Sequence, residues 1–170
     1  MKKTKEIISD KVAVVNQILP HTNKWAWDLF IDGAANNWMP TEISMAKDIE
    51  QWRSDLLTND EKLVVKRSLG FFAGSESLVA NNLLLSIFKY VTDPECRQYI
   101  LRQAYEESLH NLTVVYCCDS LGLKIDEVYQ AYNSIPSIKS KDEFLMNICT
   151  DIHRPGFNIN TLEVKRESLR

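Results

Sequence analysis

A glutamate and a histidine lie three residues apart in the segment Glu107-Glu-Ser-Leu-His110. In a helix this spacing puts both side chains on one face, with about 5–6 Å between their Cβ atoms. A carboxylate and an imidazole placed in this way can bind the same metal ion. The spacing is also common on solvated helix surfaces, so a second feature is needed before it indicates a metal site.

Glu76 provides that second feature, because it lies on an otherwise apolar stripe of the preceding segment. Thr58 and Glu61 form a capping-box pair that begins a helix, which we expect to run from Thr58 to Tyr90. Following the three-to-four spacing of a helix, every other member of the stripe is apolar. These members are Val65, Leu69, Phe72, Val79, Leu83 and Ile87.

A lone carboxylate on a core-facing stripe costs several kcal/mol of desolvation unless it is paired, protonated or bound to a metal. A protonated carboxyl and an arginine partner remain open as alternatives. Carboxylate-bridged dimetal bundles combine helices that supply one glutamate with helices that supply a Glu-x-x-His pair. The sequence therefore favours a metal site made by Glu76, Glu107 and His110.

The composition predicts one all-α domain. The chain has 170 residues, of which 45% are hydrophobic and only five are glycine, and this length fits a single domain. We expect an N-terminal arm with short helices over 1–57, two long ligand-bearing helices over 58–121, and short helices over 122–170. The last segment ends in the opening turns of a helix capped by Thr161, so we expect only part of a domain.

Other capping and helix-breaking residues predict where the helices begin and end. The expected helices cover Asn23–Asn36, a short stretch after Ser44, a long stretch from Asp93 and Pro94 to Gly122, residues around Asp126–Asn133, and a stretch opened by the capping box of Ser140 and Glu143.

Charge and hydropathy exclude several classes of partner. The net charge is −3 and no basic block occurs, so we expect no nucleic-acid partner. The longest apolar run, Leu83–Phe88, is too short to span a bilayer, so we expect no membrane association. The N-terminus lacks the pattern of a signal peptide, and a cytoplasmic location is expected.

The cysteines agree with a reducing compartment. Cys96, Cys117, Cys118 and Cys149 show no Cys-x-x-Cys spacing, and an adjacent pair cannot easily bridge to itself. Cys117 shares a helix stripe with His110, but a small buried hydrophobe is its favoured role.

Four stretches carry a family resemblance along essentially all of the chain. They are Asn37-Trp38-Met39-Pro40-Thr41-Glu42-Ile43, Gly70-Phe71-Phe72-Ala73-Gly74-Ser75-Glu76-Ser77, Pro94-Glu95-Cys96-Arg97-Gln98 and Gln103-Ala104-Tyr105-Glu106-Glu107-Ser108-Leu109-His110. Together they resemble the small, radical-generating subunit of class I ribonucleotide reductase, most closely its chlamydial-type branch. The resemblance implies a ferritin-like dimetal-carboxylate helical bundle, of which this chain matches the first half.

The resemblance also implies roles for individual residues. Glu76 matches the family's first carboxylate ligand, Glu107 its bridging glutamate and His110 its imidazole ligand. Trp38 matches the tryptophan that passes an electron to the oxidised cluster. Without the resemblance, Trp38 would be interpreted as an ordinary aromatic anchor beside a proline.

Val114 occupies the position of the family's usual radical tyrosine. Because valine cannot form a stable radical, the resemblance favours a Mn/Fe cluster over an Fe/Fe cluster with a tyrosyl radical. Tyr116 lies two residues along the helix from Val114 and therefore on roughly the opposite face. Tyr105 also lies on roughly the opposite face of the helix from Val114.

The resemblance further implies O₂, a large catalytic subunit as partner and a homodimer. The family's third carboxylate and second Glu-x-x-His pair have no counterpart in these 170 residues. His21 and His153 are expected to be solvated rather than to replace them. By resemblance the chain is an oxidoreductase, the small subunit of ribonucleoside-diphosphate reductase. The alternatives are a ligand-binding Mn/Fe oxidase of the same superfamily and a non-catalytic fragment that pairs with a homologue.

Overall fold

A computed structural model describes residues 6–9, 15–152 and 155–159. These ranges contain helices and no strand, with one isolated bridge between Ile8 and Val91, and the all-α prediction is confirmed. None of the helices in these ranges is long and apolar enough to cross a membrane. The predictions for His153, Thr161 and residues 162–170 lie outside the described residues.

The helices follow one another along the chain with short connections. They are α1 Lys24–Ala35, the 3-10 turn η1 Pro40–Glu42, α2 Ala46–Arg53, α3 Asn59–Asn81, the π-helical turn η2 Asn82–Ile87, α4 Pro94–Leu121, α5 Ile125–Tyr129, α6 Ala131–Ser134 and α7 Pro136–Asp151.

Contacts divide the chain into two compact units. One comprises residues 1–37, 80–105 and 148–170, and the other comprises residues 38–79 and 106–147. The division of the chain into 1–57, 58–121 and 122–170 remains a prediction.

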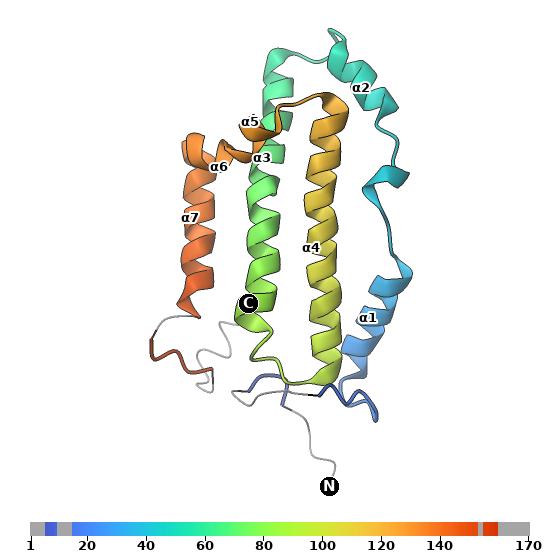
Figure 1. Ribbon diagram of the computed structural model, residues 1–170, viewed down its shortest axis with the longest axis vertical. Coiled ribbons are helices and arrows are strands. Elements are labelled where there is room, and N and C mark those ends of the chain that lie inside the picture. The colour runs from blue at the N-terminus through green and yellow to red at the C-terminus, as the bar shows by residue number, and fades with distance from the viewer. Residues whose placement is uncertain (1–5, 10–14, 153–154, 160–170) are drawn as a thin grey trace. The chain divides into compact units, whose positions relative to one another are not determined.

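In the second unit, residues 59–79 of α3 run beside residues 106–121 of α4 (Figure 1). Small and medium apolar side chains form the core, which packs against Leu69, Leu123 and Tyr129. The core residues are Ala73, Val114, Cys118 and Val128. This pairing of α3 with α4 brings Glu76 into the neighbourhood of Glu107 and His110.

Local capping fixes both long helices as the sequence predicts. The Thr58 N–H and hydroxyl each donate to Glu61 Oε2 at 2.8 Å, while the Glu61 N–H donates to Thr58 Oγ1 at 3.2 Å. At the end of α4, Gly122 has a φ of +66°. The Leu123 and Gly122 N–H groups donate to the carbonyls of Cys118 and Asp119, at 2.9 and 3.2 Å. Together these bonds make a Schellman stop.

Two expected boundaries were wrong. The predicted Thr58–Tyr90 helix is α-helical only to Asn81 and continues as η2, where the Phe88 N–H donates to the Leu83 carbonyl five residues back. A π turn changes the rotation per residue, so the three-to-four stripe does not extend to Leu83 and Ile87.

The last described helix begins earlier than expected. Ser140 lies inside α7, which starts at Pro136. Proline is favoured at the first helical position because it has no N–H to leave unpaired and its φ is already helical. Glu143 forms an ion pair with Lys139 at 3.8 Å instead of capping the helix.

The stripe that carries Glu76 is not buried as expected. Val65, Phe72 and Val79 are 37%, 46% and 38% exposed. The buried residues of α3 are Gly70, Ala73 and Ser75, so α3 packs on the core with a neighbouring face. The described residues cover that neighbouring face and leave Val65, Phe72 and Val79 of the stripe exposed.

Gly70 lies where α3 comes close to the segment that follows α4. A Cβ built at Gly70 would lie 2.5 Å from the Ala131 Cβ and 2.9 Å from the Val128 carbonyl oxygen. Both neighbours belong to short helices and cannot swing aside as a long side chain could. A glycine at this position therefore permits the packing.

We expect Gly70→Ala to lower the free energy of unfolding by about 1–2 kcal/mol. Overpacking costs about 1–3 kcal/mol, and the better helix propensity of alanine returns up to ~1 kcal/mol of this. Thermal unfolding followed by circular dichroism would measure the change in stability. Gly33→Ala is the matched control, because its Cβ would meet only the flexible Arg102 side chain, at 3.1 Å. An equal melting temperature for the two variants would contradict this account.

In the first unit, two buried carboxylates fix the start of α4. Asp93 and Glu95 are both 0% exposed. Asp93 caps the helix by accepting the Cys96 N–H at 2.9 Å and also accepts the Asn23 side-chain amide at 2.8 Å. Glu95 accepts the Thr22 N–H at 2.8 Å. These bonds tie the residues before α1 to the N-terminus of α4.

His21 belongs to the same cluster and is only partly solvated, because 27% of its side chain is exposed. Its ring stacks on Trp27 with 5.3 Å between centroids, and its Nδ1 lies 3.5 Å from Glu95 Oε1. The buried Glu95 carboxylate interacts with the ring and holds it partly buried. Nothing local in the sequence predicts this pairing of His21 with Glu95.

Asp93→Ala should destabilise the fold by about 1–2 kcal/mol at pH 7, the usual cost of losing an N-cap. Burial alone would raise the pKa of Asp93, but hydrogen bonds from Cys96 and Asn23 outweigh burial and lower it. The stabilisation is therefore complete above the unfolded pKa of about 3.9 and is lost as pH falls through the lower folded value.

Urea unfolding of both proteins at several pH values would measure this effect. The difference between wild type and Asp93→Ala should shrink below about pH 4. Asp93→Asn keeps a capping side chain and should lose less stability at pH 7. A difference that is constant with pH would contradict the role of the charge.

Candidate metal centre

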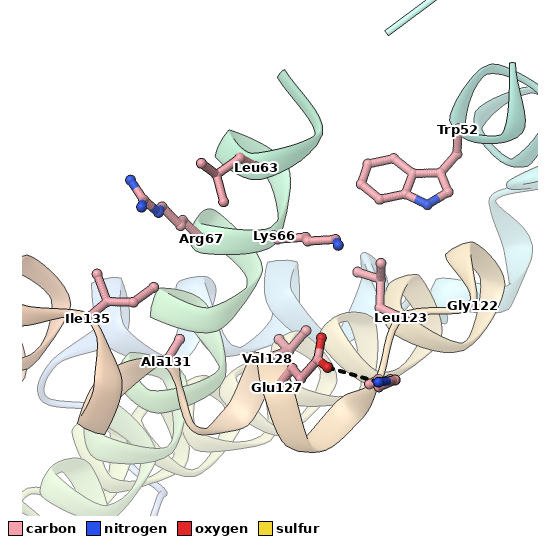
Figure 2. A pocket seen from close by; sticks show the side chains of 11 residues that line it. Trp52, Leu63, Lys66, Arg67, Gly122, Leu123, Glu127, Val128, Ala131 and Ile135 are labelled. Carbon is pink, nitrogen blue, oxygen red and sulfur yellow. Dashed lines mark ion pairs between the residues drawn. The ribbon is translucent and has the colours of Figure 1, made fainter. Parts of the chain in front are cut away.

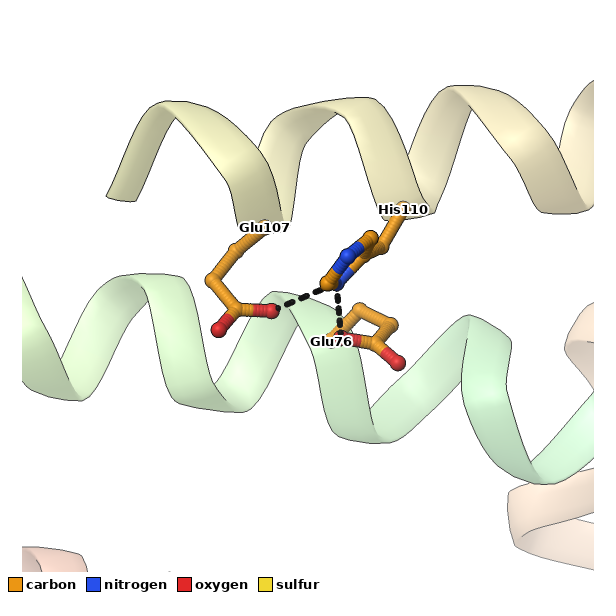
Figure 3. Close-up of side chains that lie close together, drawn as sticks. All are labelled: Glu76, Glu107 and His110. Carbon is orange, nitrogen blue, oxygen red and sulfur yellow. Dashed lines mark hydrogen bonds and ion pairs between the residues drawn. The ribbon is translucent and has the colours of Figure 1, made fainter. Parts of the chain in front are cut away.

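Three side chains converge between α3 and α4 within the second unit. His110 Nδ1 lies 3.0 Å from Glu107 Oε2 and 3.2 Å from Glu76 Oε2, as Figure 3 shows. One donor atom from each residue lies within 4.8 Å of the other two. Among the described residues, this group is the candidate for holding a metal ion. Its members are those selected by the helix spacing.

The distances from His110 Nδ1 to the two carboxylate oxygens fit a shared cation. Two donor atoms that bind one ion at about 2.0–2.2 Å lie roughly 2.8–3.6 Å apart, for angles between octahedral and tetrahedral. Both nitrogen–oxygen distances, 3.0 and 3.2 Å, fall in this range. Two carboxylates and an imidazole form a donor set suited to Mn or Fe. The role of these residues as metal ligands remains a prediction.

Charge is crowded at this site. The side chains of Glu107, Glu76 and His110 are 12%, 19% and 43% exposed. Burial raises the pKa of Glu107, and the neighbouring Glu76 raises it further, against the influence of His110. Burial lowers the pKa of His110, but its hydrogen bonds to Glu107 and Glu76 outweigh this and raise it. Glu107 and His110 thus hold their protons more strongly than usual, and a metal cation would relieve the same crowding of negative charge.

Trp38 lies next to this group. Its ring centroid is 6.3 Å from that of His110, and its indole N–H donates to Glu106 Oε2 at 2.9 Å. The sequence did not predict the Glu106 contact. A buried indole needs an acceptor, but which carboxylate supplies it depends on how the chain before η1 packs on α4.

Val114 is 5% exposed and belongs to the apolar core. With Trp38, it lines a groove of about 340 Å³ beside the three donors. The other lining residues are Leu69, Phe72, Glu76, His110 and Thr113. The groove is therefore mainly apolar and has the carboxylate and the imidazole on its wall.

The neighbouring tyrosines and Cys117 do not line this groove. The Tyr116 hydroxyl donates to the Ile43 carbonyl at 2.8 Å, and Tyr105 stacks against Arg102 with 4.9 Å between guanidinium carbon and ring centroid. Cys117 is a half-buried free thiol, whose pKa is raised by burial and by the charge of Asp48. Cys117 does not line the groove, which agrees with the role of a small packing residue that the sequence analysis favoured.

A second cavity of about 510 Å³ lies in the same unit, lined by Trp52 of α2, by α3 and by the segment around α5. Figure 2 shows Lys66 and Arg67 at its edge and an ion pair from Glu127, whose partner Lys124 is 3.1 Å away. Its cations are exposed side chains, and it shares no residue with the metal-binding group.

Comparison with known proteins gives consistent matches. The family described as ribonucleotide reductase, small chain, matches residues 15–166. The ribonucleoside-diphosphate reductase subunit beta of Chlamydia pneumoniae is 52% identical over 149 residues, which cover 88% of this chain and 43% of that protein. The small chain of Neurospora crassa is 28% identical over 128 residues, covering 74% of this chain and 31% of that protein. The chain thus spans less than half the length of these relatives.

Solved structures share the fold. The ribonucleotide reductase R2 subunit from Clostridium botulinum superposes with a TM-score of 0.76 at 20% identity, over 99% of this chain and 52% of that one. A putative class I ribonucleotide reductase from Bacillus halodurans gives a TM-score of 0.73 at 24% identity, over 86% of this chain and 50% of that one. At these identities the likeness shows the ferritin-like fold alone, and it agrees with the predicted half of such a bundle.

Proposed function

We propose, from the premise that this chain belongs to the ribonucleotide reductase small chain family, that it supplies metal ligands for the oxidant-generating centre of that enzyme. The completed small subunit would use O₂ to produce the oxidant with which a large catalytic subunit reduces ribonucleoside diphosphates to deoxyribonucleotides in the cytoplasm. This activity is a proposal for the completed protein, since the chain spans less than half of its curated relatives.

The observation that carries the proposal is the convergence of Glu76 and Glu107 on His110, whose Nδ1 lies within hydrogen-bonding distance of both carboxylates. Glu76 and Glu107 would hold the cluster through their carboxylates, and His110 through its imidazole. When bound, a dimetal cluster supplies an oxidising equivalent obtained from O₂.

Trp38 would pass the electron between this centre and the large subunit. Its ring centroid lies 6.3 Å from that of His110, which places the indole beside one of the proposed ligands. The Glu106 carboxylate holds the indole N–H at 2.9 Å and thereby fixes the ring beside the imidazole. Among the tryptophans that the structure describes, Trp38 is the one whose ring is paired with the ring of His110.

Mn/Fe is the proposed metal pair. Val114 cannot store an oxidising equivalent as a tyrosine can, and Tyr116, two residues along α4, points its hydroxyl at the Ile43 carbonyl. Because no tyrosine is among the described residues that line the groove, the oxidising equivalent would have to stay on the metals, which favours a Mn/Fe pair over Fe/Fe.

A ligand-binding Mn/Fe oxidase is the second candidate. The apolar groove of about 340 Å³ has room for part of an organic ligand beside the donors. A ligand oxidase would not need Trp38 to pass an electron to a large subunit. The two candidates therefore differ in whether activity requires a large subunit.

Anaerobic reconstitution with Mn(II) and Fe(II), followed by O₂, tests the proposal. We expect a mixed-metal electron paramagnetic resonance signal, and deoxyribonucleotide formation when a chlamydial-type large subunit is added to the completed small subunit. Metal uptake without nucleotide turnover in that complex would favour the ligand oxidase. Absence of any metal uptake would contradict both and leave a non-catalytic fragment.

A further inference from the structure

A polar bridge joins α3 to α4 directly beside the donor group. The Ser77 hydroxyl donates a hydrogen bond to Asn111 Oδ1 at 3.2 Å. Ser77 follows Glu76 in the chain, and Asn111 follows His110. Each end of the bridge is therefore attached to the residue next to a proposed metal ligand.

We propose that Ser77 and Asn111 are positioning residues for the metal centre and that they act by fixing the register of α3 against α4. This inference rests on the proposed function of Glu76, Glu107 and His110 as metal ligands. It adds two residues to which neither the helix spacing nor the family resemblance gives a role.

Helix geometry places both ends of the bridge on the faces that carry the ligands. On α4, Asn111 lies four residues after Glu107, so the two side chains share one stripe of the helix. On α3, Ser77 lies four residues after the buried Ala73 and next to Glu76. The bridge and the ligands therefore occupy the facing sides of the two helices.

The Asn111 amide is held in the orientation that the bridge needs. Its Nδ2 donates to the Glu107 carbonyl at 3.2 Å, so its Oδ1 is the atom that accepts the Ser77 hydroxyl. A hydroxyl has one proton to donate. A second acceptor, the Ala73 carbonyl, lies farther from Ser77 Oγ, at 3.5 Å. The shorter bond is the one that crosses from α3 to α4.

The apolar core by itself does not fix how far α3 slides along α4. Ala73 and Val114 belong to this core, and hydrophobic contact has no preferred direction. A hydrogen bond has a preferred distance and angle, so a slide by one residue, about 1.5 Å, would break the bridge. Glu76 lies between Ala73 and Ser77 in the chain, and both attachments hold the segment that carries it.

Metal binding depends on this register because the ligands come from two helices. Glu107 and His110 share α4, and helix geometry alone sets their spacing. Glu76 reaches them from α3 (Figure 3), and its Oε2 lies 3.2 Å from His110 Nδ1. Because a ligand set must be held to within about 0.5 Å, a small slide of α3 would remove Glu76 from a shared coordination sphere.

Anaerobic isothermal titration of the completed small subunit with Mn(II) tests the inference on Ser77→Ala. We expect the affinity to fall about tenfold, the lower end of the usual cost of losing a residue that orients metal ligands. Alanine is the better helix former, so a merely structural role for Ser77 would leave the affinity unchanged and the melting temperature equal or higher. An affinity equal to that of the wild type would overturn the inference.

Two further variants separate the hydroxyl from its surroundings. Ser77→Thr keeps a hydroxyl and should bind Mn(II) about as tightly as the wild type. Ser68→Ala is the matched control, because Ser68 is also an exposed serine of α3 but lies roughly two turns before Glu76. It should leave the affinity unchanged. A loss in either variant equal to that in Ser77→Ala would show that the Ser77 hydroxyl is not the cause, and the inference would be wrong.

A double-mutant cycle tests whether the two residues act through one bond. Asn111→Ala should also weaken Mn(II) binding about tenfold. The double variant, Ser77→Ala with Asn111→Ala, should lose no more than the weaker-binding single variant, because the effects of two bonded partners are not additive. A loss equal to the product of the two single losses would mean that the residues act independently, which contradicts the bridge.

Failure of the proposed function would give a different result. If the wild type and all variants bind no Mn(II), then Glu76, Glu107 and His110 are not metal ligands, and both the proposed function and this inference are wrong. If the wild type binds Mn(II) and Ser77→Ala binds it equally well, the proposed function stands and only the role of the bridge is overturned.

Discussion

Glu107→Ala is expected to abolish specific metal binding, weakening it by at least about 100-fold. Mutation of residues that merely orient metal ligands already costs 10–100-fold in affinity, and Glu107 is itself a donor, 3.0 Å from the donor nitrogen of His110. Its loss leaves one carboxylate and one imidazole, which hold an ion weakly. Isothermal titration with Mn(II) under anaerobic conditions measures the change.

Glu106→Ala is the matched control for this prediction. It removes a carboxylate from the adjacent position on the same helix, but Glu106 faces the indole of Trp38 at 2.9 Å and is not part of the donor group. Its metal affinity should stay within about threefold of wild type, because Glu106 supplies no donor atom to the group. Equal losses in both variants would mean that general negative charge, and not the donor geometry, attracts the ion.

Trp38→Phe should keep metal binding and lose nucleotide reduction. Phenylalanine retains the aromatic packing against His110 but is far harder to oxidise, and it has no N–H for Glu106. We expect turnover with the large subunit to fall by at least about 100-fold, equivalent to ~2.7 kcal/mol on the barrier. Metal content per chain and the rate of deoxyribonucleotide formation by the completed small subunit are the two measurements.

Trp52→Phe is the control, because Trp52 lines the separate cavity of about 510 Å³ and no residue of the donor group borders it. Its turnover should equal that of wild type. Normal turnover in Trp38→Phe would contradict the electron-transfer role proposed for Trp38.

Local signals in the sequence predicted much of the secondary structure. The capping box of Thr58 and Glu61, the N-cap Asp93 and the stop at Gly122 each depend on residues within a few positions of one another. For the same reason, the relative positions of Glu107 and His110 on α4 follow from helix geometry alone. Glu76 was selected as the polar member of an apolar stripe.

Features that depend on packing between distant segments could not be predicted. The Trp38–Glu106 hydrogen bond joins residues 68 positions apart, and the buried contacts of Asp93 and Glu95 join α4 to residues before α1. The exposure of Phe72 and Val79 was missed for a related reason. A periodic apolar stripe shows that a face needs cover, but not whether the same chain provides it.

Crystals of the chain grown with Mn(II), with anomalous diffraction data collected at the Mn edge, test the central claim most directly. The account predicts an anomalous peak about 2.0–2.4 Å from carboxylate oxygens of Glu76 and Glu107 and from His110 Nδ1. A peak bound elsewhere, or no peak while the three side chains remain hydrogen-bonded only to one another, would contradict it.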